Sequence, residues 1–179
     1  MPYLKYFDNK TNYGNRGMVL EEDINATNEY YLTNDIAVIY KKPTPIKILK
    51  LDYTTNKITN AFFETQSTLD YNGIYKGKYI DFDAKETNNH TSFPLNNIHP
   101  HQLLHMKRII SHGGITFLII AMNGLFYYLD GKDILEFIDT NKRKSIPLSY
   151  IEDKGYIINK RIRPRIDYIE VLNNIYFKE

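Results

Sequence analysis

Two acidic residues and a lysine fall on one face of a β-strand that the sequence predicts over residues 78–85. Side chains in a strand alternate between two faces, so Asp81, Asp83 and Lys85 point one way and the apolar residues between them point the other way. A carboxylate and an ammonium group two residues apart therefore stand side by side. Asp70 precedes this strand at the distance of a hairpin, so a second carboxylate could reach the same point.

Such a group of residues could carry out metal-dependent phosphodiester hydrolysis. Carboxylate oxygens bind hard divalent cations, and a bound cation activates water and offsets charge on a phosphate. A lysine beside the carboxylates can orient the nucleophile or stabilise the transition state. Thr68 lies two residues before Asp70, and Gln102 lies early in the next predicted helix, where its amide oxygen could complete a metal site.

Two other interpretations of these residues stay open. An acid and a lysine on a strand are often only a surface ion pair, which contributes little to stability. His101 and His105 lie one helical turn apart with His99 beside them, a spacing that zinc could use. A solvated helix start that is rich in histidine explains these three residues as well, because no cysteine and no His-Glu-X-X-His motif completes a zinc site.

The composition excludes several classes of protein. The chain has 179 residues, of which 42% are hydrophobic and 25% charged, which suits one domain with its own core. It has no cysteine, which excludes disulfide scaffolds, thiolate zinc sites and cysteine nucleophiles. The longest apolar run, residues 115–122, is too short to cross a bilayer, and the first residues lack an apolar segment of signal-peptide length. We therefore expect a cytoplasmic protein.

The net charge of +2 is unevenly distributed. Residues 142–165 carry eight basic residues against two acidic ones, a local balance of +6. Residues 1–35 carry three basic residues against six acidic ones. A basic C-terminal third fits a polyanionic partner such as a nucleic acid, although charge runs are also often only solvated surface.

The periodicity of the chain indicates the elements that must position these residues. A loose segment over residues 1–14 precedes a helix over about 16–33, and residues 46–66 are typical of a long β-hairpin that projects from the body. We expect turns at residues 72–73 and 76–77 on either side of a short connection, and then the strand at 78–85.

The second half of the chain continues the alternation of helices and strands. Pro100 begins a helix that Gly113-Gly114 ends, and a strand over 115–121 is apolar enough to be buried on both faces. Asn123-Gly124 turns the chain into a further strand at 125–129. Short helices are expected near 131–138, 147–153 and 167–177, with extended chain at 161–165. Together these elements predict a mixed β-sheet flanked by helices.

Ten blocks of sequence between about residue 13 and the end resemble one known family, in order and with nearly the same spacing. They lie at residues 15–22, 36–45, 70–73, 77–82, 84–87, 91–95, 101–102, 112–114, 144–147 and 164–168. The family is RecU, the Holliday junction resolvases. The resemblance implies the α/β restriction-endonuclease-like fold, with a mixed sheet flanked by helices and a protruding β-hairpin stalk at residues 46–66. It further implies a flexible DNA-contacting arm at residues 1–14, a single nuclease domain over 15–179, and a homodimer.

The same resemblance assigns roles to the candidate residues. Thr68, Asp70, Asp83 and Gln102 match the Mg²⁺-binding positions of the family, with Mn²⁺ as a possible substitute, and Asp70, Asp83 and Lys85 match its catalytic residues. Asp83 stands where the family usually has glutamate, so the metal preference could differ. We expect DNA contacts from basic residues outside the metal site and from one stalk aromatic: Arg16, Phe63, Lys76, Lys142, Arg143, Lys144, Arg163 and Arg165.

The function implied by the resemblance is resolution of four-way DNA junctions by paired symmetric nicks, during homologous recombination and DNA repair. Expected partners are junction DNA, a second copy of the chain, a RecA-type recombinase and a branch-migration helicase. We expect the protein to be associated with the nucleoid. The alternative is a non-catalytic junction-binding protein that modulates the recombinase. The sequence leaves open whether Glu22, on the first helix, reaches the active site.

Overall fold

The computed structural model describes residues 16–64 and 68–178, so the predicted arm at residues 1–14 lies outside the described residues. Its helices are α1 (Arg16–Thr33), α2 (Pro100–Ser111), α3 (Gly131–Thr140), α4 (Leu148–Lys154) and α5 (Tyr168–Tyr176), with a 3₁₀ turn η1 (Leu95–Asn97). Its strands are β1 (Val38–Lys41), β2 (Ile46–Asp52), β3 (Lys57–Phe63), β4 (Tyr71–Tyr75), β5 (Lys78–Glu86), β6 (Ser92–Pro94), β7 (Ile115–Met122), β8 (Leu125–Asp130), β9 (Ser145–Pro147) and β10 (Tyr156–Ile158). None of the described helices is long and apolar enough to span a membrane.

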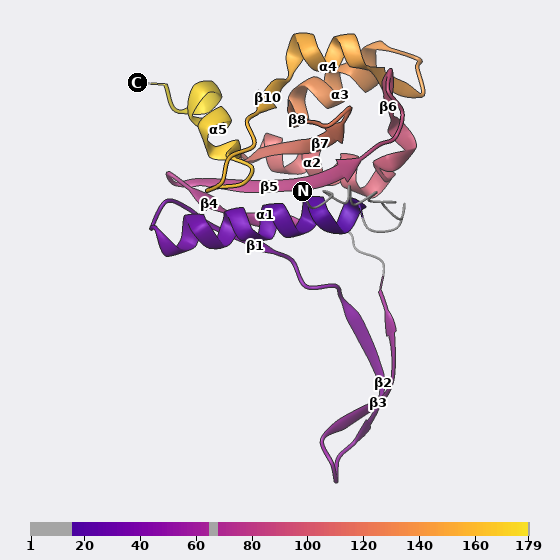
Figure 1. Ribbon diagram of the computed structural model, residues 1–179. Coiled ribbons are helices and arrows are strands. Elements are labelled where there is room, and N and C mark those ends of the chain that lie inside the picture. The colour runs from indigo at the N-terminus through magenta and orange to yellow at the C-terminus, as the bar shows by residue number, and fades with distance from the viewer. Residues whose placement is uncertain (1–15, 65–67, 179) are drawn as a thin grey trace, which may run out of the picture.

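A six-stranded mixed sheet forms the body, with the strand order β1-β4-β5-β7-β8-β10 (Figure 1). Strands β5 and β7 are parallel and the other pairs are antiparallel. The parallel pair requires a crossover connection, which α2 supplies. Helices α1 and α5 pack on one face of the sheet, and α2, α3 and α4 pack on the other. The predicted fold class, a restriction-endonuclease-like mixed sheet flanked by helices, is confirmed.

Strand β7 is buried on both faces, as its continuous apolar sequence predicts. Phe117 and Ile119 face the cluster below α1, whereas Leu118 and Ile120 face the cluster below α2 and α3. Strand β5, in contrast, has one apolar face and one face that carries charged residues. Phe82 stacks on Tyr71 and on Phe117, with ring centroids 4.8 and 4.6 Å apart, so the apolar face of β5 anchors the strand in the core.

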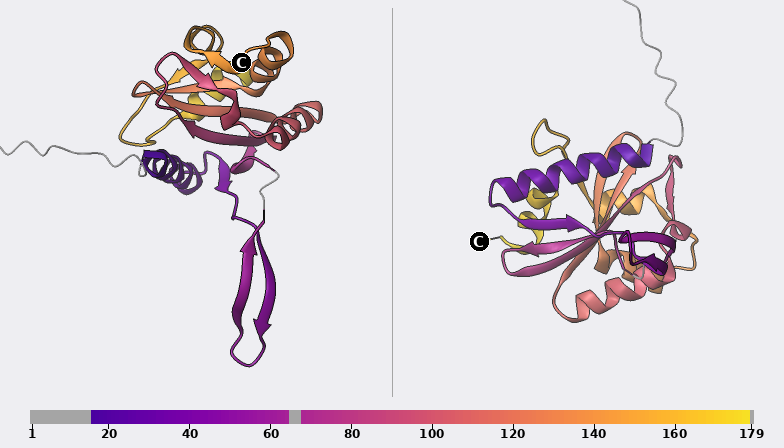
Figure 2. Two further views of the ribbon diagram at one scale, coloured as in Figure 1. Left: turned by 90° about the vertical axis from the view of Figure 1, so that its right-hand side faces the viewer. Right: turned by 90° about the horizontal axis from the view of Figure 1, so that it is seen from below.

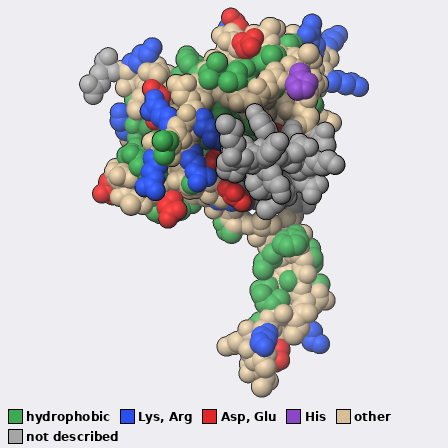
Figure 3. Space-filling view, viewed as in Figure 1, with side chains coloured by type: hydrophobic (Ala, Val, Ile, Leu, Met, Phe, Trp, Pro, Cys, Tyr) green, Lys and Arg blue, Asp and Glu red, His purple; other side chains and the backbone are tan. Residues whose placement is uncertain are grey.

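The β2–β3 hairpin confirms the predicted stalk and extends away from the body (Figures 1 and 2). The two strands pair with each other and join no other sheet among the described strands. All seven residues of β3 are exposed. Figure 3 shows hydrophobic side chains on the part of the stalk nearest the body and charged ones near its tip. An isolated two-stranded hairpin is only marginally stable in water, so the stalk adds little to the stability of the body.

The turn predicted at Asn72-Gly73 is wrong. Both residues lie inside β4, and Gly73 is paired with Ile39 of the edge strand β1. Glycine is needed here for close approach: a Cβ atom on Gly73 would lie 2.0 Å from the Val38 carbonyl oxygen and 2.6 Å from the Ile39 Cα. The second predicted turn is correct, because Lys76 and Gly77 join β4 to β5 with positive φ angles.

Alanine at position 73 is therefore expected to push β1 away from β4 and to lower the free energy of unfolding by at least about 2 kcal/mol. Urea denaturation measures this change. Asn72→Ala is the matched control, because its partly buried side chain donates to the Tyr79 hydroxyl at 3.1 Å, and its cost should stay below about 1 kcal/mol. Equal stability of Gly73→Ala and wild type would show that the close approach is unimportant.

The sequence did not indicate β10 or the small β6–β9 ribbon. Each of these strands has only three residues, too few to show a periodicity. The β6–β9 pairing brings the end of the loop after β5 next to the basic loop at residues 141–144.

Candidate active site

The candidate catalytic residues converge at the carboxyl group of Asp83, whose side chain is fully buried. Lys85 Nζ lies 2.8 Å from Asp83 Oδ2, and Gln102 Nε2 donates a hydrogen bond of 2.7 Å to the same oxygen. The Ala84 backbone N–H donates to Asp83 Oδ1 at 2.7 Å. These contacts fix the carboxylate in one orientation.

The register of β4 against β5 brings Asp70 to this point. Tyr71 pairs with Phe82 in an antiparallel ladder. One step further along both strands, Asp70 therefore lies opposite Asp83. Directly opposed residues in an antiparallel pair have neighbouring side chains on the same face. The Asp70 carbonyl also accepts a 2.7 Å hydrogen bond from the Lys42 N–H, which attaches the end of β1 to the site.

The two carboxyl groups repel each other. Burial, and then the negative charge of the adjacent Asp83, raise the pKa of Asp70 to about 6, and the ammonium groups of Lys85 and Lys41 only partly oppose this rise. A divalent cation between the two carboxylates would offset this repulsion, so the electrostatics suit a metal site.

The raised pKa predicts that the protein releases a proton when it binds a divalent cation near pH 6, because Asp70 must be ionised to act as a ligand. Calorimetric titration of the metal-free protein with Mg²⁺ at pH 6, in buffers of different ionisation enthalpy, should show release of roughly half a proton per site. At pH 8 the release should vanish, and Asp70→Asn should abolish it at pH 6. Equal heats in all buffers at pH 6 would contradict the assignment of Asp70.

The other two predicted ligands fit to different degrees. The half-buried Thr68 donates a long hydrogen bond, 3.3 Å, from its hydroxyl to the Leu69 carbonyl. Within residues 16–64 and 68–178 its oxygen accepts no hydrogen bond, so it could serve as a ligand. The Gln102 amide oxygen accepts the His99 N–H at 3.0 Å, and its amide nitrogen faces Asp83. As arranged, Gln102 orients Asp83, and the amide must rotate before its oxygen can face a metal.

The histidines do not form the alternative zinc site. His99 and His101 stack with ring centroids 5.4 Å apart, while His105 Nε2 lies 3.0 Å from Asp81 Oδ2. Across residues 16–64 and 68–178, no three histidine or acidic side chains are placed to hold a metal ion together. The zinc alternative has no geometric support in this part of the chain.

The sequence left open whether Glu22 of α1 reaches the active site. Glu22 is exposed. Glu21 forms an ion pair with Lys41. Burial raises the pKa of the Tyr71 hydroxyl, and the negative charges of Glu21, Asp70 and Asp83 raise it further. Glu21, and not Glu22, is therefore the acid of α1 whose charge acts on Tyr71, the neighbour of Asp70 in sequence.

The residues predicted to contact DNA are spread over the body and stalk. Lys142, Arg143 and Lys144 are exposed on the loop before β9, and Phe63 is 77% exposed on the stalk. Lys76 lies at the far end of β4 from Asp70, where it donates to Asn173.

Three further residues predicted to contact DNA lie on α1 and on the loop before α5. Arg163 is exposed on the loop before α5, and in the same loop Arg165 donates to Asp23 of α1 at 2.8 Å. Arg16 is the first residue of α1. The DNA contacts proposed for all these residues stay predictions.

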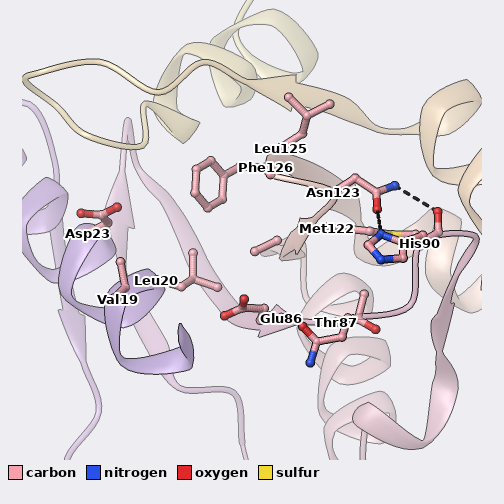
Figure 4. Close-up of a pocket in the computed structure, with 13 residues that line it drawn as sticks. Val19, Leu20, Asp23, Glu86, Thr87, His90, Met122, Asn123, Leu125 and Phe126 are labelled. Atoms are coloured by element: carbon pink, nitrogen blue, oxygen red, sulfur yellow. Dashed lines mark hydrogen bonds between the residues drawn. The ribbon is translucent and has the colours of Figure 1, made fainter. Parts of the chain in front are cut away.

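A cavity of about 580 Å³ lies beside the start of α1, between the end of β5 and the β7–β8 turn (Figure 4). At its rim His90 and Asn123 hydrogen-bond to each other, with the His90 Nδ1 to Asn123 Oδ1 distance 2.6 Å. Its lining includes Leu20 and Phe126 but none of the candidate catalytic residues. The catalytic candidates instead lie on the opposite face of β5.

Comparison with known proteins decides the family. The family model described as Recombination protein U matches residues 15–174. The chain belongs to the RecU family. It is 52% identical over 176 residues to the Holliday junction resolvase RecU of Bacillus mycoides, with 94% of this chain and 88% of the relative covered. The Geobacillus sp. and Bacillus cytotoxicus proteins of the same description are 52% and 51% identical, covering 93% and 94% of this chain and 87% and 88% of the relatives.

Proposed function

We propose that the protein is a structure-specific endonuclease that resolves four-way DNA junctions by paired symmetric nicks, in homologous recombination and DNA repair. The observation that carries the proposal is the adjacent carboxyl groups of Asp70 and Asp83, with Lys85 2.8 Å from Asp83. The RecU relatives, each described as a Holliday junction resolvase, support the same conclusion. Membership of this family also supports action at the nucleoid.

We propose Mg²⁺ as the cofactor, with Mn²⁺ as a substitute. Asp70, Asp83 and Thr68 would hold the ion, and Gln102 would join them after its amide rotates. When bound, the ion supplies a Lewis acid that makes water a better nucleophile and offsets the negative charge of the phosphate. Aspartate at position 83 is one methylene shorter than the usual glutamate, so the site could favour a different metal from its relatives.

Residues around Asp83 supply the other parts of the proposed mechanism. The Ala84 N–H and the Gln102 amide hold Asp83 in place, so little reorganisation is needed when substrate arrives. Lys85 extends its ammonium group to the surface of the site, where its side chain is 22% exposed. From there it can orient the attacking water and stabilise the charge that develops on the phosphate. We expect 5′-phosphate and 3′-hydroxyl ends.

We infer that the active form is a homodimer, because symmetric nicks in two strands require two sites related by a twofold axis. The exposed apolar side chains of the stalk support this inference, since a second copy or the junction could cover them. They include Ile46, Ile48, Leu49, Ile58 and Phe62. Analytical ultracentrifugation should show a dimer. A RecA-type recombinase and a branch-migration helicase are proposed as further partners.

The proposed function is tested by incubating the purified protein with a mobile four-way junction and with a linear duplex, in Mg²⁺ or Mn²⁺. The junction should be nicked and the duplex left intact. Binding of the junction without nicking in either metal would instead support the non-catalytic alternative, in which the protein modulates the recombinase.

A further inference from the structure

A second buried carboxylate, Asp81, lies on the same face of β5 as Asp83. Its side chain is fully buried, and one oxygen, Oδ2, accepts three donors: Lys42 Nζ at 2.8 Å, the Tyr79 hydroxyl at 2.8 Å and His105 Nε2 at 3.0 Å. The donors come from the end of β1, from β5 itself and from α2. The proposed metal chemistry uses none of these four residues.

This arrangement is costly if its role is only structural. The other oxygen of Asp81, Oδ1, is buried without a hydrogen-bond partner among the described residues. Removing a carboxylate from water costs several kcal/mol, and an incompletely satisfied ion pair recovers only part of that cost. Apolar residues of similar size would stabilise the sheet as well. A buried polar atom left without a partner beside a candidate active site indicates a functional role.

The two nitrogen donors remain within reach of a ligand. The Lys42 side chain is 17% exposed and that of His105 is 19% exposed. Because both approach the same Asp81 oxygen, their nitrogens lie close together, with Asp81 behind them. The His105 Nε2–H is already donated to Asp81, whereas the Lys42 ammonium group has two further hydrogens. An anionic group at the surface, such as a phosphate, could therefore accept a hydrogen bond from Lys42 while Asp81 and His105 hold the ammonium group in place.

The position of this pair fits the path of a DNA strand. Asp81 precedes Asp83 by two residues, about 6.6 Å along the strand. Lys42 is tied to Asp70 through its backbone N–H, and Pro43-Thr44-Pro45 leads directly from it into the stalk. Lys42 thus lies between the stalk and the carboxyl groups of the candidate active site.

We propose that Lys42 binds a backbone phosphate of the junction next to the one that is cut, and that Asp81 and His105 are the positioning residues that hold its ammonium group at the surface. The proposal rests on the proposed function, because it takes junction DNA as the ligand. It adds a second anchor for the strand beside the metal site.

The test is the salt dependence of junction binding, measured for Lys42→Gln in an Asp70→Asn background that cannot cleave. Loss of one phosphate contact should reduce the slope of log K against log salt concentration by about 0.9. Lys42→Arg should keep the wild-type slope. Lys107→Gln is the matched control, because Lys107 is exposed on α2 about 200° around the helix from His105, and it should also leave the slope unchanged.

His105→Ala provides a second variant if Lys42→Gln does not fold, as judged by thermal unfolding. It should weaken junction binding, whereas Lys107→Gln should not. Two results would overturn the phosphate site even if the wild type still cleaves junctions. In the first, the salt slope of Lys42→Gln equals that of its Asp70→Asn background. In the second, His105→Ala binds the junction as tightly as Lys107→Gln does. Failure of the wild type both to bind and to cleave junctions would overturn the proposed function as well.

Discussion

Asparagine at position 83 is expected to reduce the rate of junction cleavage by at least about 100-fold, while junction binding is retained. The substitution keeps the size of the side chain but removes the charge that faces Asp70 and Lys85. A neutral amide is a poor ligand for a hard cation, and it no longer fixes the Lys85 ammonium group. Single-turnover cleavage at saturating protein measures the effect on the chemical step alone.

Two variants make this prediction specific to the site. Asp83→Glu keeps the carboxylate one methylene further along the side chain and should remain active. Asp139→Asn removes a carboxylate from the exposed end of α3 and should cleave at the wild-type rate. Cleavage by Asp83→Asn at the rate of Asp139→Asn would remove Asp83 from the proposed mechanism.

Removal of the stalk is expected to abolish the preference for four-way junctions over linear duplex without lowering the melting temperature of the body. Residues 46–63 can be replaced by a short Gly-Ser connection, since β2 and β3 pair only with each other among the described strands. The body keeps both hydrophobic clusters in such a variant. Competition binding between the two DNA forms measures the preference, and circular dichroism measures the melting temperature.

A single aromatic residue should carry part of this effect. Phe63 is 77% exposed, and the stacking of one base on an aromatic ring contributes about 1–3 kcal/mol. Phe63→Ala should therefore weaken junction binding by about 1–3 kcal/mol and leave duplex binding unchanged. If the stalk-deleted protein still selected junctions, specificity would have to come from the body.

The sequence predicted the parts of the site that depend on local periodicity. Alternation along β5 is enough to place Asp83 and Lys85 on one face, because strand geometry leaves no other arrangement. The position of Asp70 beside Asp83 depends on the register of β4 against β5. The sequence could not predict that register, because Asn72-Gly73 was interpreted as a turn and not as part of β4. A glycine serves a turn and a close strand approach equally well, so its type alone could not distinguish the two.

The network around Asp81 could not be predicted in the same way. Its partners Lys42 and His105 lie 39 and 24 residues away, and only the packing of β1 and α2 against β5 brings them together. The alternation did show that Asp81 shares the face of Asp83, which is the one signal for it in the sequence. The amide orientation of Gln102 likewise follows from the start of α2, through the His99 N–H.

Junction resolution by this protein can be tested by mapping the nicks on a mobile junction labelled in turn on each strand, followed by treatment with DNA ligase. We expect nicks at symmetric positions in two opposed strands, products that ligase seals without further processing, and no nicks from Asp70→Ala. Nicks at unrelated positions, ends that ligase cannot seal, or an Asp70→Ala protein as active as wild type would contradict this expectation.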